Sequence, residues 1–337
     1  MLATRPACPN QAYIDGHWCD AEDGRRFDVT NPATGAVIAS VADCGVTETR
    51  AAIAAARAAQ AGWAALTAGQ RGAILRRWRD LMVERADELA LILTRENGKP
   101  LAEARGEILY GASYLEWFAE EAKRIYGEII PSASANNRIL VTKQPVGVCA
   151  AITPWNFPNA MLMRKAAAAL AAGCTMVAKP AAETPLSALI AAQLGMEAGV
   201  PAGVFNIVTS ARAAEVGGEL TSSPDVRKIT FTGSTGVGRL LLQQSAATVK
   251  KASMELGGNA PFIVFDDADL DAAIDGAMAS KFRNAGQTCV CANRMFVQSG
   301  IMPEFAKRLA ARVAALKVGD GEMAGCEVGP LINEAGL

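Results

Sequence analysis

Two cysteines stand one residue apart in the stretch NAGQTCVCANR, residues 284–294. Cys289 and Cys291 are too few for a structural zinc site, which takes four ligands and usually draws them from two pairs. A thiol can also serve as a nucleophile, which then needs a base, and the only histidine, His17, lies far upstream in the sequence. The stretch therefore indicates a redox pair or one nucleophile beside a bystander, and we expect no metal.

Two polar residues elsewhere could assist such a nucleophile. Glu255 precedes two glycines in MELGGNAP, residues 254–261, at the end of an expected strand, where a carboxylate can serve as a general base. Asn156 lies in TPWNFP, residues 153–158, after an apolar strand, and its amide N–H groups could bind a developing oxyanion. A salt bridge or helix cap would explain the glutamate equally well, and an ordinary proline turn would explain the asparagine. Both alternatives stay open.

A glycine-rich stretch, FTGSTGVG at residues 231–238, follows an expected strand and opens an expected helix. Its glycines would let the backbone approach a phosphate at the helix N-terminus. The spacing is not the G-x-G-x-x-G fingerprint of dinucleotide-binding folds, so a plain strand-to-helix turn is an equal alternative. The acidic cluster at residues 266–271 lacks the calcium-loop spacing of an EF-hand, and helix capping explains it better.

The elements that would position these residues alternate between strand and helix from residue 139 onward. Apolar or β-branched runs at 139–152, 174–179, 204–208 and 226–231 are separated by stretches with helical spacing. This alternation predicts an α/β fold with a doubly wound parallel sheet. A second, smaller α/β unit follows in the order PFIVF, DLDAAIDGAMASKF, RMFVQ and PEFAKRLAARVAAL. With so few strands it looks incomplete.

The first third of the chain reads as helical. Thr47 is the expected cap of a helix that runs to residue 66, and a second helix over residues 72–99 is expected to stop at Gly98 and Pro100. A third helix follows from Leu101 to about residue 124. The polar segment PSASANNRILVTKQPVG then predicts a protruding hairpin or a surface loop.

The composition excludes several classes of protein. The 337 residues are 51% hydrophobic, which predicts a globular chain of about two domains. A net charge of −1 gives no electrostatic basis for binding nucleic acid or an anionic membrane. The first twenty residues lack a signal-peptide core, and no apolar run reaches the roughly 20 residues of a membrane span. Eight scattered cysteines fit reduced thiols in a cytoplasm.

Five motifs taken in order resemble the aldehyde dehydrogenase superfamily. They are TPWNFP, AKPAAETPLSAL, FTGST, MELGGNAP and NAGQTCVCANR. Two longer stretches, ELGGNAPFIVFDDADLD and AMLMRKAAAALAAGCT, look closer to its NAD(P)-dependent succinate-semialdehyde branch. The resemblance implies a Rossmann-like NAD(P)-binding domain at residues 1–124 and 144–254, an oligomerisation hairpin at 125–143 and a catalytic domain at 255–337. Family members continue well past residue 337, so we expect a truncated catalytic domain.

The resemblance also implies a division of labour among the candidate residues. Cys289 is the nucleophile that attacks an aldehyde, and Asn156 with the backbone N–H of Cys289 holds the oxyanion. Glu255 is the base that activates water to hydrolyse the thioester. Two arginines, Arg164 and Arg283, match those that hold the far carboxylate of succinate semialdehyde.

The cofactor positions follow from the same resemblance. An uncharged residue, Ala182, stands where members that prefer NAD usually carry an acid, and Glu183 comes one place too late, so we expect NADP more than NAD. Lys179 matches the lysine at the adenosine ribose. The positions expected to contact the cofactor are Thr153, Pro154, Trp155, Lys179, Ala182, Gly233, Ser234 and Leu256.

The expected partners are a small-molecule aldehyde and further copies of the same chain, as a dimer or tetramer, without nucleic acid or membrane. Two other functions stay open: a non-catalytic fragment that binds nucleotide or full-length subunits, and a cysteine hydrolase that acts on esters. Cys291 could form a strained, easily reduced disulfide with Cys289, or it could be a small packed residue.

Overall fold

The computed structural model describes residues 8–336, and its largest feature is a seven-stranded sheet in the order β11-β10-β7-β8-β9-β1-β2. The strands from β11 to β9 are parallel, whereas β1 and β2 extend the sheet antiparallel at one edge. The parallel centre confirms the predicted α/β fold. The strands of this sheet are β1 (Ala12–Ile14), β2 (His17–Cys19), β7 (Val148–Ile152), β8 (Thr175–Lys179), β9 (Phe205–Ile207), β10 (Val226–Thr232) and β11 (Lys251–Glu255).

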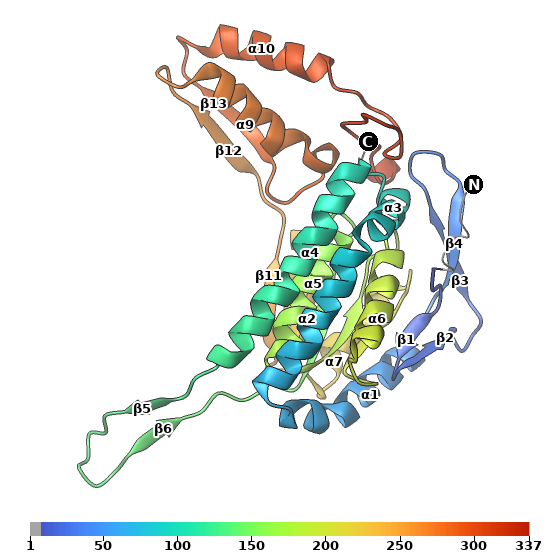
Figure 1. Ribbon diagram of the computed structural model, residues 1–337, viewed down its shortest axis with the longest axis vertical. Helices are drawn as coiled ribbons and strands as arrows, with labels where there is room; N and C mark the ends of the chain where they lie inside the picture. Colours follow the sequence, from blue (N-terminus) through green and yellow to red (C-terminus); the bar gives the residue numbers. More distant parts are fainter. Residues whose placement is uncertain (1–7, 337) are drawn as a thin grey trace.

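Helices cover both faces of the sheet, because consecutive residues of its central strand β7 are buried in two different clusters. Along β7, Val148 and Ala150 belong to one buried cluster, and Cys149 and Ala151 belong to the other. Successive side chains of a strand point to opposite faces, so both faces of β7 are packed. One face carries α1 (Val46–Ala65), α7 (Ala213–Ser222) and α8 (Thr235–Ser245), and the other carries α2 (Ala68–Glu84), α4 (Leu101–Glu121), α5 (Pro158–Ala171) and α6 (Leu186–Ala198), the group in front in Figure 1.

The strands before α1 are a feature that the sequence does not predict. Besides β1 and β2, the chain forms an antiparallel pair, β3 (Arg26–Thr30) and β4 (Val37–Ala42). Most residues of this pair are exposed or half-buried, and β3 (RFDVT) is not an apolar run. The N-terminal region is therefore strand and helix in succession rather than helical throughout.

Two details of the predicted helices are wrong. The expected helix over residues 72–99 is divided into α2 and α3 (Ala86–Asn97), because the backbone of Arg85 leaves the helical region. Thr47 is not a helix cap, because α1 already begins at Val46. Instead, the Glu48 carboxylate accepts the backbone N–H of Gly45 at 2.6 Å, which satisfies one of the free donors at the start of α1.

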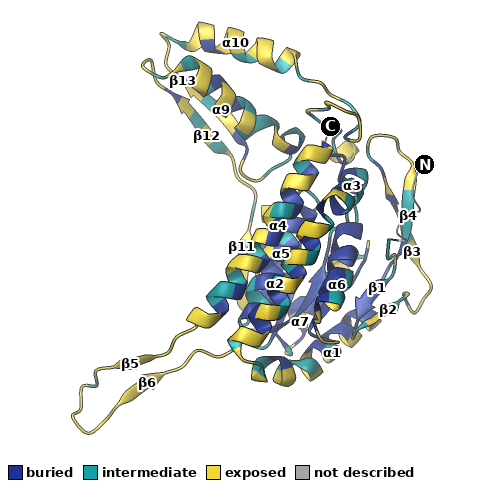
Figure 2. Cartoon of the chain, viewed as in Figure 1, coloured by how far each residue is buried: buried dark blue, intermediate teal, exposed yellow. Residues whose placement is uncertain are grey.

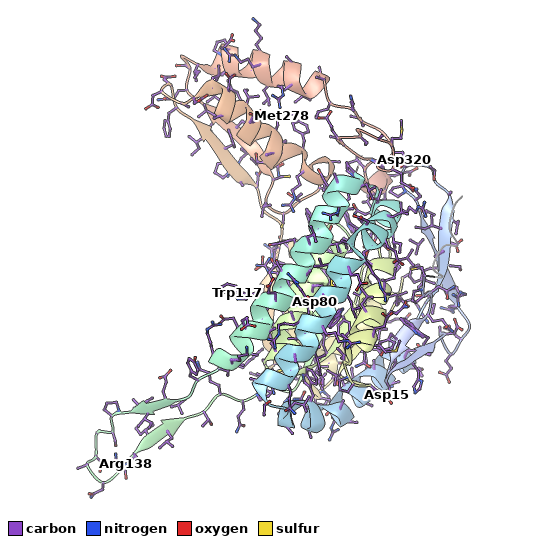
Figure 3. All side chains as sticks on the ribbon, in the orientation of Figure 1. Asp15, Asp80, Trp117, Arg138, Met278 and Asp320 are labelled. Atoms are coloured by element: carbon purple, nitrogen blue, oxygen red, sulfur yellow. The ribbon has the colours of Figure 1, made fainter. Side chains whose placement is uncertain are left out.

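The predicted hairpin is present and points away from the sheet. After α4 and the short turn η1 (Ala122–Arg124), strands β5 (Glu128–Ile130) and β6 (Ile139–Val141) pair antiparallel. Figure 3 labels Arg138 at the far end of this arm. Ile129 is 77% exposed and Leu140 is 68% exposed, so the arm carries apolar side chains with little cover in this chain.

A small α/β unit stands beyond the carboxyl edge of the large sheet (Figure 1). It contains the parallel pair β12 (Ala260–Val264) and β13 (Ala292–Val297) with α9 (Leu270–Phe282) and α10 (Met302–Ala314). Asp269 accepts two backbone N–H groups at the start of α9, which confirms the capping expected for the acidic cluster. Only a few of its residues, such as Val264 and Phe305, are buried, and Figure 2 shows α10 largely exposed.

The last described segment returns to the large unit. The carbonyl oxygen of Gly321 accepts the backbone N–H of Leu101 at 3.0 Å, and a β-carbon on Gly329 would meet the Gly98 carbonyl. This segment therefore packs on the turn between α3 and α4. Among residues 8–336, no helix is both long enough and apolar enough to cross a membrane.

Candidate active site

The carboxyl ends of four neighbouring strands bring several candidate residues to one edge. The register pairs Thr232 of β10 with Glu255 of β11, and it pairs Ile152 of β7 with Lys179 of β8. Thr153 follows Ile152 directly, so these residues line the same edge of the sheet. In open parallel sheets this edge is where ligands bind.

The nucleophile candidate sits on a loop with an unusual backbone. Asn284, Ala285 and Gly286 follow one another with φ angles of 50°, 55° and 77°, directly after α9. The left-handed conformation costs a residue with a β-carbon roughly 1–2 kcal/mol, so two of these three residues need compensating contacts. The turn reverses the chain and presents Cys289, which is exposed.

Hydrogen bonds from the sheet edge supply those contacts. The side-chain amide of Asn156 donates to the carbonyl of Gln287 at 2.9 Å, and the side chain of Asn284 donates to the carbonyl of Asn156 at 3.1 Å. Glu103 on α4 accepts the backbone N–H of Asn284 at 2.9 Å. An amide carries two N–H donors, so Asn156 keeps one for an oxyanion beside Cys289.

The two cysteines occupy different environments. Cys289 is exposed, whereas Cys291 is 1% exposed. The hydroxyl of Thr288 donates to Cys291 Sγ at 2.8 Å, and the Cys291 thiol donates to the Lys281 carbonyl at 3.5 Å. Only the first cysteine is therefore presented for attack on a substrate in this conformation.

The strand end with Glu255 lies against the same loop. A β-carbon on Gly258 would come within 2.8 Å of the Cys289 carbonyl oxygen, so only glycine fits there. Glu255, three residues earlier, is exposed, and its own carbonyl accepts the N–H of Gly233 at 3.1 Å. The histidine His17 lies on β2, at the opposite edge of the sheet from β11. Glu255 therefore stays the base candidate, and His17 does not lie at this edge.

A buried ion pair holds the turn that carries Asn156. The Lys99 ammonium lies 2.5 Å from Glu107, and both side chains are almost completely buried. The same ammonium donates to the Asn156 carbonyl at 2.7 Å and lies 4.1 Å from the centre of the Phe157 ring. Burial lowers the pKa of Lys99, and the nearby Glu107 carboxylate opposes that shift.

The two predicted substrate arginines lie in different surroundings. Arg164 on α5 is exposed and stacks on Tyr114 at 5.7 Å, in a cleft of about 740 Å³ that Trp117 also lines. Arg283, also exposed, stacks on the Phe157 ring at 4.6 Å and lines a separate cleft of about 460 Å³. The structure therefore places Arg283 on Phe157, next to Asn156, but it places Arg164 in a different cleft, so the two arginines do not share one cavity.

The cofactor candidates lie around the carboxyl edge, and the buried groups there suit a polar ligand. The hydroxyl oxygens of Thr153 and Thr232 are buried and have no hydrogen-bond partner among the described residues. Lys179 is buried, donates to the Pro180 carbonyl at 3.1 Å, and burial lowers its pKa to about 8. Unsatisfied buried donors at a ligand-binding edge fit the hydroxyls and phosphates of a dinucleotide.

The remaining cofactor candidates surround these groups. Ser234 caps α8 by accepting the Val237 N–H at 3.4 Å, and Leu256 packs so closely on Gly238 that a β-carbon there would clash. The Trp155 carbonyl accepts the Asn97 amide at 2.9 Å. Pro154, Ala182 and Gly233 are half-buried.

Comparison with known proteins decides the family. The model of the aldehyde dehydrogenase family matches residues 18–337. The chain belongs to the aldehyde dehydrogenase family. Its predicted membership is therefore confirmed.

Relatives within the family narrow the comparison. The chain is 62% identical to the NADP(+) succinate-semialdehyde dehydrogenase GabD of Escherichia coli, over 96% of this chain and 67% of that protein. It is also 62% identical to a glutarate-semialdehyde dehydrogenase of Pseudomonas aeruginosa, with the same coverage. A crystal structure of an aldehyde dehydrogenase from Brucella melitensis superposes with a TM-score of 0.97 at 59% identity, covering 99% of this chain and 70% of that one. The chain thus spans about two thirds of the length of these relatives.

One residue of this aldehyde dehydrogenase site escapes prediction from sequence. Lys99 lies in ENGKP, where glycine and proline indicate only the end of a helix. A lysine is most often exposed, and nothing in the local pattern indicates that Glu107, two helical turns later, will bury it. Only the packing of α4 on α5 reveals the pair.

Proposed function

We propose that the protein oxidises a short acid-semialdehyde, with succinate semialdehyde as the first candidate, to the corresponding acid with NADP+ or NAD+. The observation that carries this proposal is the exposed Cys289 on a loop bonded to Asn156 and touching the strand end after Glu255. These contacts support a site in which the proposed nucleophile, oxyanion donor and base come from three separate parts of the sequence.

Each residue would have a defined task. The Cys289 sulfur, as thiolate, adds to the aldehyde carbon, and the carbonyl electron pair moves to oxygen, where Asn156 and the Cys289 N–H stabilise the charge. When bound, the nicotinamide ring accepts a hydride from that carbon. Glu255 then takes a proton from the water that hydrolyses the resulting thioester, and the acid leaves as the Cys289 thiolate returns.

The carboxylate of the substrate would bind an arginine. Arg283 is the stronger candidate, because its guanidinium is exposed and already lies on Phe157, the neighbour of Asn156. Arg164 lines the other cleft, beside Tyr114 and Trp117, and is the second candidate. The two relatives that match at 62% are named for semialdehydes that differ by one carbon, so the comparison favours a terminal carboxylate over a particular length.

The cofactor is NADP in preference to NAD. An uncharged Ala182 places no negative charge beside a 2′-phosphate, and the relative from Escherichia coli is named for NADP(+). Thr153, Lys179, Gly233 and Ser234 would hold it at the carboxyl edge of the sheet. Burial lowers the pKa of Lys179, and the carboxylate of Glu183, which follows Ala182, opposes that shift. This carboxylate is therefore near enough to influence the preference for NADP over NAD.

The assembly and location are part of the proposal. Residues 1–124 and 144–254 form the cofactor domain, residues 255–337 belong to the catalytic domain, and the exposed arm at 125–143 pairs with another subunit in a dimer or tetramer. All eight cysteines are free thiols, which supports a cytoplasmic location.

Turnover with succinate semialdehyde tests the function directly. We expect reduced nicotinamide to appear with NADP+ and more slowly with NAD+, and butanal, which lacks the carboxylate, to react poorly. Cys289→Ser should lower the rate more than about 10³-fold, whereas the matched variant Cys291→Ser should keep most of it.

The outcome also separates the alternatives. Saturable cofactor binding and an alkylated Cys289 without any product would identify a nucleotide-binding fragment instead of an enzyme. Hydrolysis of an ester such as p-nitrophenyl acetate without nicotinamide, together with no oxidation of any aldehyde, would identify a cysteine hydrolase. Equal rates for Cys289→Ser and the parent would remove the proposed nucleophile.

A further inference from the structure

The Lys99–Glu107 pair contacts the end of the turn between β7 and α5 and the first turn of α5. Lys99 donates to the Asn156 carbonyl at 2.7 Å and lies over the Phe157 ring. The other oxygen of Glu107 accepts the backbone N–H groups of Asn159 and Ala160 at 3.0 and 3.1 Å. The pair thus holds the backbone from the Asn156 carbonyl to the first turn of α5.

Stability alone gives a weak reason for this arrangement. Removing two charges from water costs several kcal/mol each, and buried ion pairs are often replaceable by apolar residues without loss of stability. The ammonium has three donors, and two of them point at Glu107 and at the Asn156 carbonyl. The geometry is therefore specific for the turn that carries Asn156.

A second observation connects the pair to the nucleophile loop. The Asn156 carbonyl that accepts Lys99 also accepts the side chain of Asn284, and the Asn156 amide donates to Gln287. The Asn156 backbone is therefore held by Lys99 on one side and by the loop on the other. A shift of this backbone would move the oxyanion donor relative to Cys289 while leaving the sulfur exposed.

We infer that Lys99, paired with Glu107, is a positioning residue that aims the Asn156 amide at the oxygen of the substrate. This inference rests on the proposed function, since the oxyanion exists only if Cys289 adds to an aldehyde. It assigns to the ENGKP turn a part in the first chemical step. An oxyanion donor displaced by a fraction of an ångström loses most of its effect, because its hydrogen bond must reach the charge as it develops.

The test uses the neutral double variant Lys99→Met/Glu107→Gln. It leaves no unpaired buried charge, and the glutamine oxygen can still accept the N–H groups of Asn159 and Ala160, so the fold should persist. We expect kcat/KM for succinate semialdehyde to fall roughly 10- to 100-fold. The rate of Cys289 alkylation by iodoacetamide should stay within about twofold, since alkylation develops no oxyanion.

Two reference variants define the pattern. Asn156→Ala should show the same separation, with lower turnover and unchanged alkylation. Arg85→Met removes a half-exposed ion pair with Glu197, 2.5 Å long and remote from the site, and should change neither rate by more than about twofold. Turnover in the double variant within about threefold of the parent would overturn the inference. A parallel fall of alkylation would also overturn it, since Lys99 would then support the whole loop.

A measurement without cofactor keeps this test separate from that of the proposed function. Succinate semialdehyde that adds reversibly to Cys289 protects the thiol against iodoacetamide, even in a chain that yields no reduced nicotinamide. We expect the concentration needed for half-protection to rise about tenfold in the double variant. Equal protection of parent and double variant would reject the role of Lys99, whereas protection without turnover would reject the dehydrogenase only.

Discussion

The loop with Cys289 and the strand end with Glu255 touch each other, yet the protein supports them very differently. Residues 284–287 are hydrogen-bonded to three parts of the chain. The Asn284 N–H donates to Glu103 on α4, the Asn156 amide donates to Gln287, and the Ile332 N–H of the last described segment donates to Gln287 at 3.0 Å. Strand β11 is an edge strand, and its residues are exposed or half-buried. The loop that carries the proposed nucleophile is thus bonded to several other elements, and the base candidate stands at an open edge.

This difference teaches where the precision of the site comes from. Attack on a carbonyl needs sulfur and oxyanion donor in fixed relative positions, which a strained loop with many bonds can supply. Activation of water needs a carboxylate with room for a solvent molecule, which an exposed strand end can supply. The two regions should therefore respond differently to substitution.

The largest difference between thioester formation and hydrolysis is expected from Glu255→Gln. This change removes the base but leaves Cys289 and Asn156 in place, so thioester formation should continue while hydrolysis slows about 10²- to 10⁴-fold. In rapid-mixing experiments we expect one burst of reduced nicotinamide per active site, followed by almost no steady turnover.

The matching variant in the region of the Cys289 loop is Asn156→Ala, which should slow the burst itself. If Glu255→Gln abolished the burst as well, the glutamate would act before hydrolysis, and the division between the two regions would fail. The measurement is the stopped-flow absorbance of the reduced cofactor at saturating succinate semialdehyde.

A smaller effect, on stability, is expected when a glycine is replaced by alanine in the Cys289 loop and, separately, at the strand end after Glu255. Gly286 has φ of 77°, and a β-carbon there would lie 3.2 Å from the Lys281 carbonyl, so Gly286→Ala should lower the free energy of unfolding by about 1–2 kcal/mol. At Gly257 a β-carbon would meet only Thr235 Oγ1 at 3.9 Å, so Gly257→Ala should leave that free energy unchanged or slightly higher. Urea unfolding measures both, and equal losses would contradict the contrast.

The same contrast shows what could be predicted from the sequence. The runs at 174–179 and 204–208 correctly identify the central strands β8 and β9, because burial on both faces favours mostly apolar sequence. The residues around Cys289 indicate a redox pair or one nucleophile, and only the resemblance to the family assigns that role to Cys289. Glu255 is a base candidate from the residues alone, but a salt bridge or helix cap would explain it equally well, so again the resemblance favours the catalytic role.

What the sequence does not reveal depends on contacts between distant residues. The helix break at Arg85 has neither glycine nor proline to indicate it, and Arg85 pairs with Glu197, 112 residues away. The left-handed turn at Asn284 and Ala285 is stabilised by Glu103 and Asn156, which no local pattern connects. Strands β3 and β4 are also missed from the sequence, because they form by pairing with each other rather than by burial of both faces.

A modest pH dependence of kcat/KM for NADP+ is expected from Lys179, which is buried at the sheet edge where Glu255 is exposed. Burial lowers the pKa of Lys179 to about 8, so its ammonium is charged below that pH and becomes neutral above it. A positive charge favours the 2′-phosphate of NADP+, so kcat/KM for NADP+ should fall about three- to tenfold as pH rises through 8. For NAD+ the fall should be smaller. Lys179→Met should give a low and flat profile over this range, and a parent profile equally flat for both cofactors would exclude the lysine from the cofactor site.

The smallest effect concerns Cys291, whose burial contrasts with the exposure of Cys289. Peroxide would oxidise the Cys289 thiolate to a sulfenic acid with loss of water or hydroxide, and the Cys291 thiol would then displace a second water to form a disulfide. Before that, Cys291 must break its contacts with Thr288 and Lys281. Cysteines separated by one residue make a strained bond, which dithiothreitol should reduce readily.

We therefore expect untreated Cys291→Ser to have activity within about twofold of the parent, since Cys291 takes no part in the reaction. After peroxide treatment, the parent should recover most of its activity with dithiothreitol, and Cys291→Ser should recover less, because over-oxidation of Cys289 is no longer intercepted. Cys326→Ser is the matched control, because this half-buried thiol donates to the Gly319 carbonyl at 3.5 Å, outside the loop. If Cys291→Ser recovered as fully as that control, Cys291 would be only a packed neighbour, and the contrast between the two sulfurs would be one of burial without redox consequence.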